Sequence, residues 1–260
     1  MITQRNRLLL LLMFALSLLV FAVSGCGDDD DPVTPNPIGG NTDQFDQTTA
    51  VAQAQVAAPQ GVALVESMTG LAAGFGKDAQ DYAYNEANQR WEYHYEYSQT
   101  GYVYDWFYTV QYLNGAGQPQ REATGAASVR HTLAGTMDYG MDQGGVVFDY
   151  DYLYDYDTTL TGLGTDTLVM TGTGGFDLDY TYSAGGINQN YEYLLEWETL
   201  GAGISYPEAG CPQGTIRYTM DPYHMDLVFN GSTSAVATLY DGSGNVVAGG
   251  GGNYPLSCSK

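Results

Sequence analysis

The feature that most constrains this chain is the alternation of aromatic and polar residues between residues 81 and 247. Five stretches place an apolar, mostly aromatic residue at every second position: 91–98, 102–112, 148–157, 176–182 and 191–198. Period-two alternation puts one class of residue on each face of a β-strand. Gly-rich turn sequences separate these stretches, at 99–101, 114–117, 144–145, 174–175 and 185–186. We therefore expect a mainly antiparallel all-β meander of about nine to eleven strands, which must curl, close or stack.

The alternation gives the predicted sheet one aromatic face. The chain contains 23 tyrosines, and a buried tyrosine needs a partner for its hydroxyl. Three interpretations stay open: a sandwich or barrel core whose hydroxyls reach the rim, a cavity or groove for an apolar ligand, and a protein-contact surface. The candidate ligand face consists of Tyr93, Tyr95, Tyr104, Trp106, Tyr152, Tyr154, Tyr180, Tyr193 and Trp197.

The opposite face of the predicted sheet is acidic. The chain has 30 Asp and Glu against 8 Lys and Arg, a net charge of −22. Nucleic-acid binding needs a basic footprint, so this composition excludes it as a function. Neighbouring carboxylates repel one another and must be hydrated or neutralised by cations. Weak Ca²⁺ ligands are one reading and a solvated face is the other; the candidates are Asp149, Asp151, Asp155 and Asp157.

The first 25 residues are typical of a secretory signal. Arg5 and Arg7 precede an apolar run at 8–23 that only Ser17 interrupts. As a helix this run would be ~24 Å long, short of the ~30 Å core of a bilayer, which favours a signal sequence over a spanning helix. Loss of the two leader arginines changes the net charge from −22 to −24.

The run ends in Val23-Ser24-Gly25-Cys26, which resembles the lipobox of bacterial prolipoproteins. The resemblance implies cleavage between Gly25 and Cys26 and acylation of Cys26. Two or more acyl chains anchor a protein stably in a membrane. In enteric-type bacteria an Asp directly after the lipidated Cys retains a lipoprotein at the inner membrane, and here that position is Gly27. This residue and the acidic run at 28–31 imply an outer-membrane position, on the periplasmic face or the cell surface. The alternative is an ordinary secretory signal, with Cys26 as a plain thiol.

The remaining chain divides into a tether and one domain. Residues 26–42 carry four consecutive aspartates and three prolines, which favour an extended tether. Residues 43–260 suit a single β domain. It opens with a helical pattern at 50–58, an interruption at 59–61, and a second segment at 62–75 with an apolar stripe of Leu64, Met68, Leu71 and Phe75. We expect this helix to cover one side of the sheet; a membrane-surface helix, the alternative, would carry flanking Lys or Arg.

Two cysteines remain after Cys26, and an exported pair predicts a disulfide between Cys211 and Cys258. Such a bond would contribute about 3–4 kcal/mol; two free thiols are the alternative. His94, His131 and His224 lack metal-ligand spacing, although a site of one His with carboxylates stays open. Neither a Gly-x-Ser-x-Gly turn nor a phosphate-binding loop with Lys occurs, so we expect no enzymatic activity.

The sequence thus predicts a non-enzymatic lipoprotein of the cell envelope, attached to the membrane through the lipid on Cys26. No resident cofactor is expected beyond this lipid and weakly bound Ca²⁺. Its role is structural or interactive, with an envelope protein or a glycan as partner. The alternative is a carrier or sensor that holds an apolar ligand against the tyrosine-rich face of a half-open barrel. In architecture the predicted domain has a likeness to the unclosed barrels of lipoprotein carriers and to lipocalin-type barrels, and architecture does not settle function.

Overall fold

The computed structural model describes residues 46–72, 82–143, 146–184 and 187–258, with only the backbone described at 69, 143 and 187–193. Several predicted features lie outside these residues: the signal sequence, Cys26, the tether, Phe75 and the turns at 144–145 and 185–186. Helices α2 (Gln47–Glu66) and α3 (Met68–Ala72) come first. The strands that follow are β1 (Ala83–Asn85), β2 (Arg90–Gln99), β3 (Tyr102–Leu113), β4 (Pro119–Gln120), β5 (Ser128–Gln143), β6 (Val146–Thr161), β7 (Thr167–Ala184), β8 (Ile187–Thr199), β9 (Ile204–Pro207), β10 (Gln213–Met220), β11 (Tyr223–Asn230), β12 (Ser234–Tyr240) and β13 (Gly252–Pro255).

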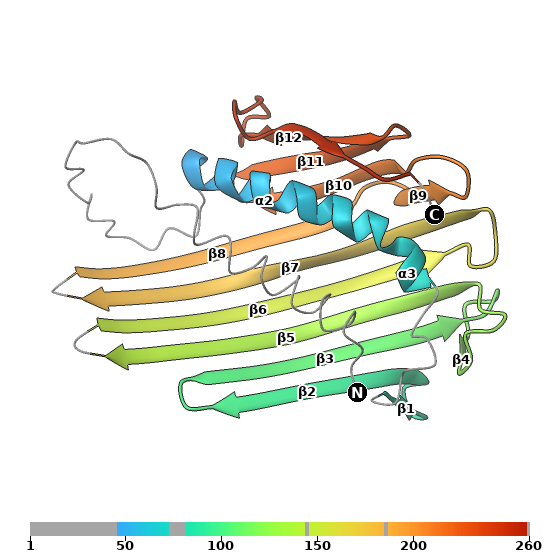
Figure 1. Cartoon of the computed structure of the whole chain (residues 1–260), viewed down its shortest axis with the longest axis horizontal. Helices are drawn as coiled ribbons and strands as arrows, with labels where there is room; N and C mark the ends of the chain where they lie inside the picture. The colour runs from blue at the N-terminus through green and yellow to red at the C-terminus, as the bar shows by residue number, and fades with distance from the viewer. Residues whose placement is uncertain (1–45, 73–81, 144–145, 185–186, 259–260) are drawn as a thin grey trace. The chain divides into compact units, whose positions relative to one another are not determined.

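The strands form one antiparallel sheet in the order β1-β2-β3-β5-β6-β7-β8-β10-β11-β12-β13, with β4 beside β3 and β9 between β7 and β10 (Figure 1). The expected fold class is confirmed: the domain is mainly antiparallel β, with an N-terminal helix packed on the sheet. The sheet is a partial ring that does not close, because β1 and β13 do not pair in the described chain. Thirteen strands replace the expected nine to eleven because β1, β4 and β9, of two to four residues each, are too short to show alternation.

The sheet has two parts of different strand length. Strands β3 and β5–β8 contain 12 to 18 residues, whereas β10–β13 contain 4 to 8. Only residues 196–199 of β8 pair with β10. The long strands therefore extend past β10–β13 and past α2 (Figure 1). We call this extension the projecting half, and the part of the sheet under α2 and α3 the covered half.

Helix α2 is continuous, so the interruption predicted at 59–61 is wrong. Pro59 lies inside the helix on its exposed side. Proline removes one intrahelical hydrogen bond, but its would-be acceptor belongs to Gln55, which is also exposed and can bond water. On the other side, a line of small buried residues packs on the sheet and keeps the helix intact; the line consists of Ala50, Ala54, Ala57, Ala58, Gly61, Val62 and Val65. Tertiary packing here outweighs local propensity.

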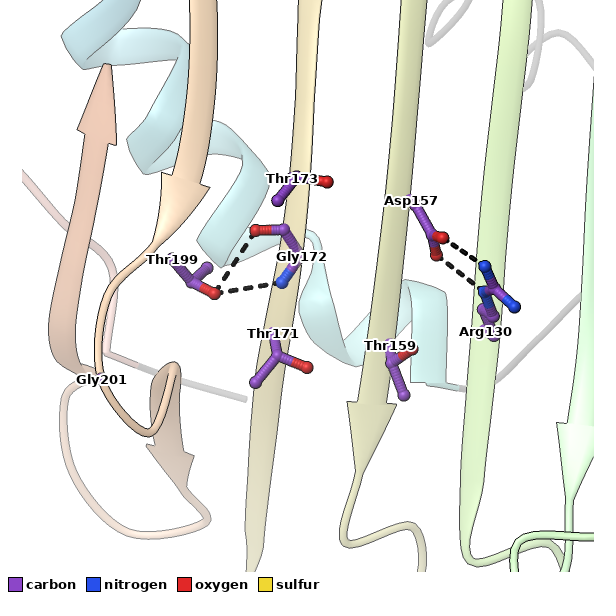
Figure 2. Close-up of a pocket in the computed structure, with 8 residues that line it drawn as sticks. All are labelled: Arg130, Asp157, Thr159, Thr171, Gly172, Thr173, Thr199 and Gly201. Atoms are coloured by element: carbon purple, nitrogen blue, oxygen red, sulfur yellow. Dashed lines mark hydrogen bonds and ion pairs between the residues drawn. The ribbon is translucent and has the colours of Figure 1, made fainter. Parts of the chain in front are cut away.

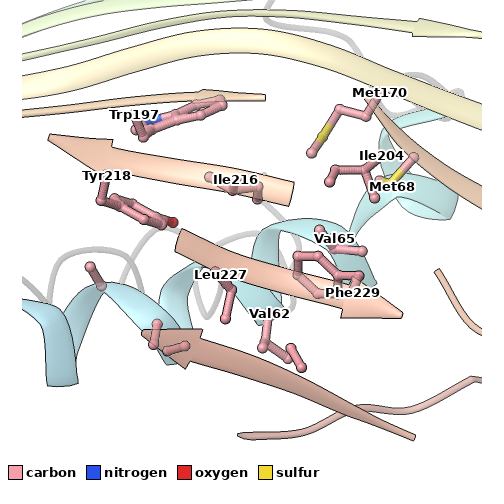
Figure 3. Packing of buried hydrophobic residues seen from close by; sticks show 14 of the residues in the cluster. Val62, Val65, Met68, Met170, Trp197, Ile204, Ile216, Tyr218, Leu227 and Phe229 are labelled. Carbon is pink, nitrogen blue, oxygen red and sulfur yellow. The ribbon is translucent and has the colours of Figure 1, made fainter. Parts of the chain in front are cut away.

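The residues that the helices bury differ in part from the predicted apolar stripe of Leu64, Met68, Leu71 and Phe75. Met68 is fully buried, but Leu64 and Leu71 are only half-buried against the core. The contact between α2 and the sheet is close at Gly61, where an added Cβ would lie 2.6 Å from Leu227 Cδ2 and 2.7 Å from Tyr218 Oη. Figure 3 shows the core that fills this half, with residues from α2 facing Ile216 and other residues of the sheet.

The turn predicted at Gly174-Gly175 is also wrong, because both residues lie inside β7. A Cβ at Gly174 would meet Trp197 Nε1 at 2.6 Å, and one at Gly175 would meet the Leu195 carbonyl oxygen at 2.6 Å. The glycine pair therefore lets β8 and the Trp197 ring approach β7. A glycine in a strand interior marks such a close approach as readily as it marks a turn.

The disulfide between Cys211 and Cys258 is confirmed, with Cα atoms 4.6 Å apart. It joins the segment before β10 to the C-terminal tail. The tail also contacts α2: the Ser257 amide donates to Glu66 Oε1 at 2.7 Å. Tyr206 Oη donates to the Ser257 carbonyl at 3.1 Å. Helix, sheet and tail are thus tied together at one end of the covered half.

Candidate functional site

Strand register places aromatic residues on one face across five strands. Directly paired residues of antiparallel strands share a face. One row of such partners crosses β2, β3, β5, β6 and β7 as Tyr95, Trp106, Gly135, Tyr154 and Phe176. We define the aromatic face as the following residues of the projecting half and of the adjoining strand β2: Tyr95, Tyr97, Tyr102, Tyr104, Trp106, Tyr139, Phe148, Tyr150, Tyr152, Tyr154, Phe176, Tyr180 and Tyr182.

The rings of this face form a layer of edge and parallel contacts. Along β6 the rings of Tyr150, Tyr152 and Tyr154 stand nearly parallel, with neighbouring centroids 6.2 and 6.3 Å apart. Rings from adjacent strands fit against this row, as Phe176 does 5.7 Å from Tyr152. At Gly135 an added Cβ would lie 3.2 Å from Trp106 Cδ2, so the missing side chain gives the indole its place. The face is therefore an ordered layer of rings.

The aromatic layer is partly open to solvent. Most of its side chains are half-buried, while Tyr95 and Tyr97 at the β2 margin are 46% and 40% exposed. Met141, on the same face at the end of β5, is 37% exposed. Rings of this kind present an apolar body with a polar tip, a combination enriched at binding interfaces.

The hydroxyls of Tyr150 and Tyr154 in this layer stay protonated at physiological pH. Burial raises the pKa of Tyr150 to about 12, and the neighbouring Tyr102 adds to the shift. Burial likewise raises the pKa of Tyr154 to about 12, with a further contribution from the charge of Asp155. These two residues therefore offer neutral hydroxyl donors among apolar rings.

The same side of the sheet continues under the helices into a buried polar contact. His131 of β5 is 1% exposed, and its Nδ1 lies 2.7 Å from Tyr108 Oη. Burial lowers the pKa of His131 to about 4, while the backbone of Leu71 in α3 contributes in the opposite direction. The neutral imidazole thus belongs to the packing of α3 on the sheet. The sequence indicates this only weakly, since His131 stands in an otherwise apolar alternation.

The other side, which we call the acidic face, carries Glu96, Asp105, Asp138, Asp149, Asp151, Asp155, Asp157, Asp177, Asp179, Glu196 and Glu198. Asp138, Asp151 and Asp179 stand directly opposite one another on β5, β6 and β7. A hydrogen bond with Asp138 is the largest cause that raises the pKa of Asp151 to about 6; burial and the charges of Asp138, Asp149 and Asp179 add to it.

The predicted Ca²⁺ ligands Asp149, Asp151, Asp155 and Asp157 all lie on the acidic face of β6. Asp157 is held by a two-point ion pair with Arg130. Within the described ranges no three His, Cys, Asp or Glu side chains are grouped closely enough to hold a metal ion. Weak Ca²⁺ binding stays a prediction.

The Arg130–Asp157 pair lies beside a depression of about 500 Å³ on the acidic face (Figure 2). Threonine hydroxyls line it, and Thr199 Oγ1 accepts from the Gly172 amide at 3.0 Å. A second depression of about 400 Å³ lies next to Gly175, between Leu153 and Leu194. The first depression thus holds an arginine–aspartate ion pair and a hydrogen-bonded Thr199 hydroxyl, which together form a surface arrangement. Sequence reasoning missed it because Arg130 and Asp157 become neighbours only through the register of β5 and β6.

The structure brings together most of the predicted ligand residues. Tyr93, Tyr95, Tyr104, Trp106, Tyr152, Tyr154 and Tyr180 share one side of the sheet. Trp197 is on that side but is 8% exposed within the core of the covered half. For Tyr193 only the backbone is described, and it pairs with Leu178.

Comparison with protein families, curated proteins and solved structures finds no match to this chain. Among the described helices, none combines the length and apolar character needed to cross a membrane.

Proposed function

We propose that this protein is a lipid-anchored, non-enzymatic lipoprotein of the cell envelope that recognises an envelope partner with its aromatic face. The observation that supports this most is the contrast between the two halves of one sheet side. In the covered half the side is filled by α2 and α3; on the aromatic face most rings are only half-buried, and Tyr95 and Tyr97 are 46% and 40% exposed. A layer of tyrosine rings with neutral hydroxyls suits contact with an amphipathic surface, such as a protein or glycan.

A carrier or sensor of an apolar ligand is the second candidate. The partial-ring form of the sheet and the exposed apolar Met141 on the aromatic side favour it. The two candidates differ in the size of what lies on the rings. A partner protein adds kilodaltons, whereas a lipid-like ligand adds the mass of one small molecule.

Site-specific photo-crosslinking tests both candidates in intact cells. A benzophenone amino acid placed at Tyr97, on the aromatic face, is compared with one at Leu153, which is 49% exposed on the acidic face. We expect a discrete protein or glycan adduct from position 97 only, and its loss when Tyr95→Ser is added. An adduct of lipid mass would favour the carrier, and equal labelling at both positions would contradict a role for this face.

The anchor is tested separately. Metabolic labelling with a tritiated fatty acid should mark the wild-type chain and leave Cys26→Ala unlabelled. The variant should also move from the membrane fraction to the soluble fraction, because acyl burial supplies the attachment. An unlabelled wild type, cut before residue 26 and recovered as soluble protein, would overturn the anchor and leave the aromatic-face proposal standing.

A further inference from the structure

The β2 strand has a backbone edge that the described chain leaves largely uncovered. Strand β1 pairs only with residues 90–92 of β2, while β3 pairs with residues 91–99 on the other side. Residues 94–99 therefore have a strand on one side only in the described chain, as Figure 1 shows for the end of β2 distant from β1. Alternate backbone N–H and C=O groups along such an edge point outward and can pair with an added strand.

The two ends of the sheet differ in how they limit such pairing. At the opposite end, β13 has four residues and finishes at Pro255, which cannot donate a ladder hydrogen bond. Strand β2 has ten residues, and residues 94–99 contain no proline, glycine or lysine. His94 is the one basic side chain in this segment, and its Nε2 lies 2.6 Å from Asp105 Oδ1. The usual barriers to strand addition are thus weak at this edge.

The side chains at the edge define the chemistry of an added strand. On one side, Tyr95 and Tyr97 are 46% and 40% exposed and would contact apolar side chains. On the other side, Glu96 makes no ion pair with a described residue, and Asp105, which contacts His94, stands directly opposite Glu96 on β3. Like charges in direct opposition are unfavourable, and a basic side chain beside them would relieve the repulsion. Complementarity therefore calls for a strand that alternates apolar and basic residues.

A second copy of the chain does not meet this requirement. Each copy carries a net charge of −22, so two copies repel at long range. The four described arginines are already paired with carboxylates, at Glu92, Glu86, Asp157 and Asp226. The partner must bring its own cations.

We propose that residues 94–99 of β2 form a docking edge for an extended peptide segment with alternating apolar and basic residues, which adds to the sheet as an antiparallel or parallel strand. Main-chain hydrogen bonds would provide the affinity, and the two side-chain rows would provide the specificity. The main-chain part of the proposal rests on the β2 edge alone, while Tyr95 and Tyr97 also belong to the aromatic face.

The test uses the whole protein in detergent and a fluorescent peptide that alternates Lys with Val and Tyr. We expect saturable binding that is about tenfold tighter than for a peptide of the same composition with its lysines grouped at one end. Two further peptides carry N-methyl groups on alternate residues, one on each edge of the strand. One of the two should lose binding and the other should keep it, because only one edge of an added strand pairs with β2.

Two matched variants locate the site. Glu96→Lys should weaken binding about tenfold, and Asp149→Lys, which makes the same charge change on the acidic face of β6, should weaken it less than twofold. Hydrogen exchange should slow at alternate amides of residues 94–99 when the peptide binds. Equal weakening by both variants, or full binding of both N-methylated peptides, would mean that the acidic protein attracts any cationic peptide. Either result would overturn the proposal.

Discussion

At the scale of single residues, the structure gives His131 a role that depends on its being neutral. The imidazole is buried between the Tyr108 hydroxyl and α3. Its pKa is lowered from 6.5 to about 4, so between these values the unfolded chain binds a proton that the folded chain does not. Stability must therefore fall as the pH drops from about 6.5 towards 4, by up to on the order of 3 kcal/mol.

His131→Gln tests this directly. The variant loses stability at pH 7 because its amide fits the buried contact less well, but it has no proton to take up. We expect the difference in free energy of unfolding between wild type and variant to shrink as the pH falls from 7 to 4.5. Urea unfolding followed by tryptophan fluorescence at both pH values measures it. A difference that is constant with pH would mean that His131 is not the group that titrates.

Two helix glycines provide a matched pair for packing. Gly61 faces Tyr218 and Leu227 at less than 3 Å from its Cβ position, whereas a Cβ on Gly70 in α3 would meet nothing within 4 Å. We expect Gly61→Val to lower the free energy of unfolding by about 1–3 kcal/mol through overpacking. Gly70→Val should leave it within about 0.5 kcal/mol. Equal effects, measured by denaturant unfolding, would show that backbone entropy and not the helix–sheet contact decides the result.

At the scale of elements, like charges face one another across strands. Asp151 lies between Asp138 and Asp179, and its pKa is raised from 3.8 to about 6. The folded chain therefore holds a proton in this range that the unfolded chain releases, so this contribution to stability is lost as the pH rises through about 6. Asp151→Asn removes the titration. Its stability relative to wild type should rise between pH 4.5 and 7.5.

Asp149→Asn is the control for this prediction. Asp149 lies two residues away on the same strand and face, but its direct partners are Gly140 and Thr181 and carry no charge. Thermal unfolding at the two pH values should show a smaller relative gain for this variant. If both variants gain equally, the effect is the net charge of the molecule and not the opposed row.

The same elements show what sequence could and could not predict. Alternation identified β3, β6, β7, β8 and the shared aromatic face, since period two fixes which side chains lie together, but β5 is not among the predicted alternating stretches. Pro59 and the Gly174-Gly175 pair were misread because their local preference for a break is overruled by packing, of α2 on the sheet and of Trp197 on β7. The pairing of Arg130 with Asp157 depends on the register of β5 and β6, and it was missed because β5 was not predicted as a strand.

At the scale of the whole molecule, the two halves of the sheet differ in how much apolar surface they bury. In the covered half, strand side chains such as Leu160 and Met170 are fully buried beneath α2 and α3. In the projecting half the same strands, β6 and β7, have half-buried rings on one face and exposed carboxylates on the other. Less buried apolar surface means less free energy to resist local opening.

Hydrogen exchange along β6 and β7 tests this division within single strands. Amides near Leu160 and Met170 should exchange only by global unfolding, and those near Tyr150 and Tyr180 should exchange faster, through local opening of the projecting half. Denaturant should accelerate the first group more steeply than the second, because global unfolding exposes more surface. Equal rates and equal denaturant dependence along each strand would show that the sheet opens as one unit.

In that case the aromatic layer is as stable as the covered half, and a partner would bind a surface that is already rigid. Faster exchange in the projecting half would instead mean that binding a partner must also order this part of the sheet. A partner bound to the aromatic face should then slow amide exchange at Tyr150 and Tyr180 more than at Leu160.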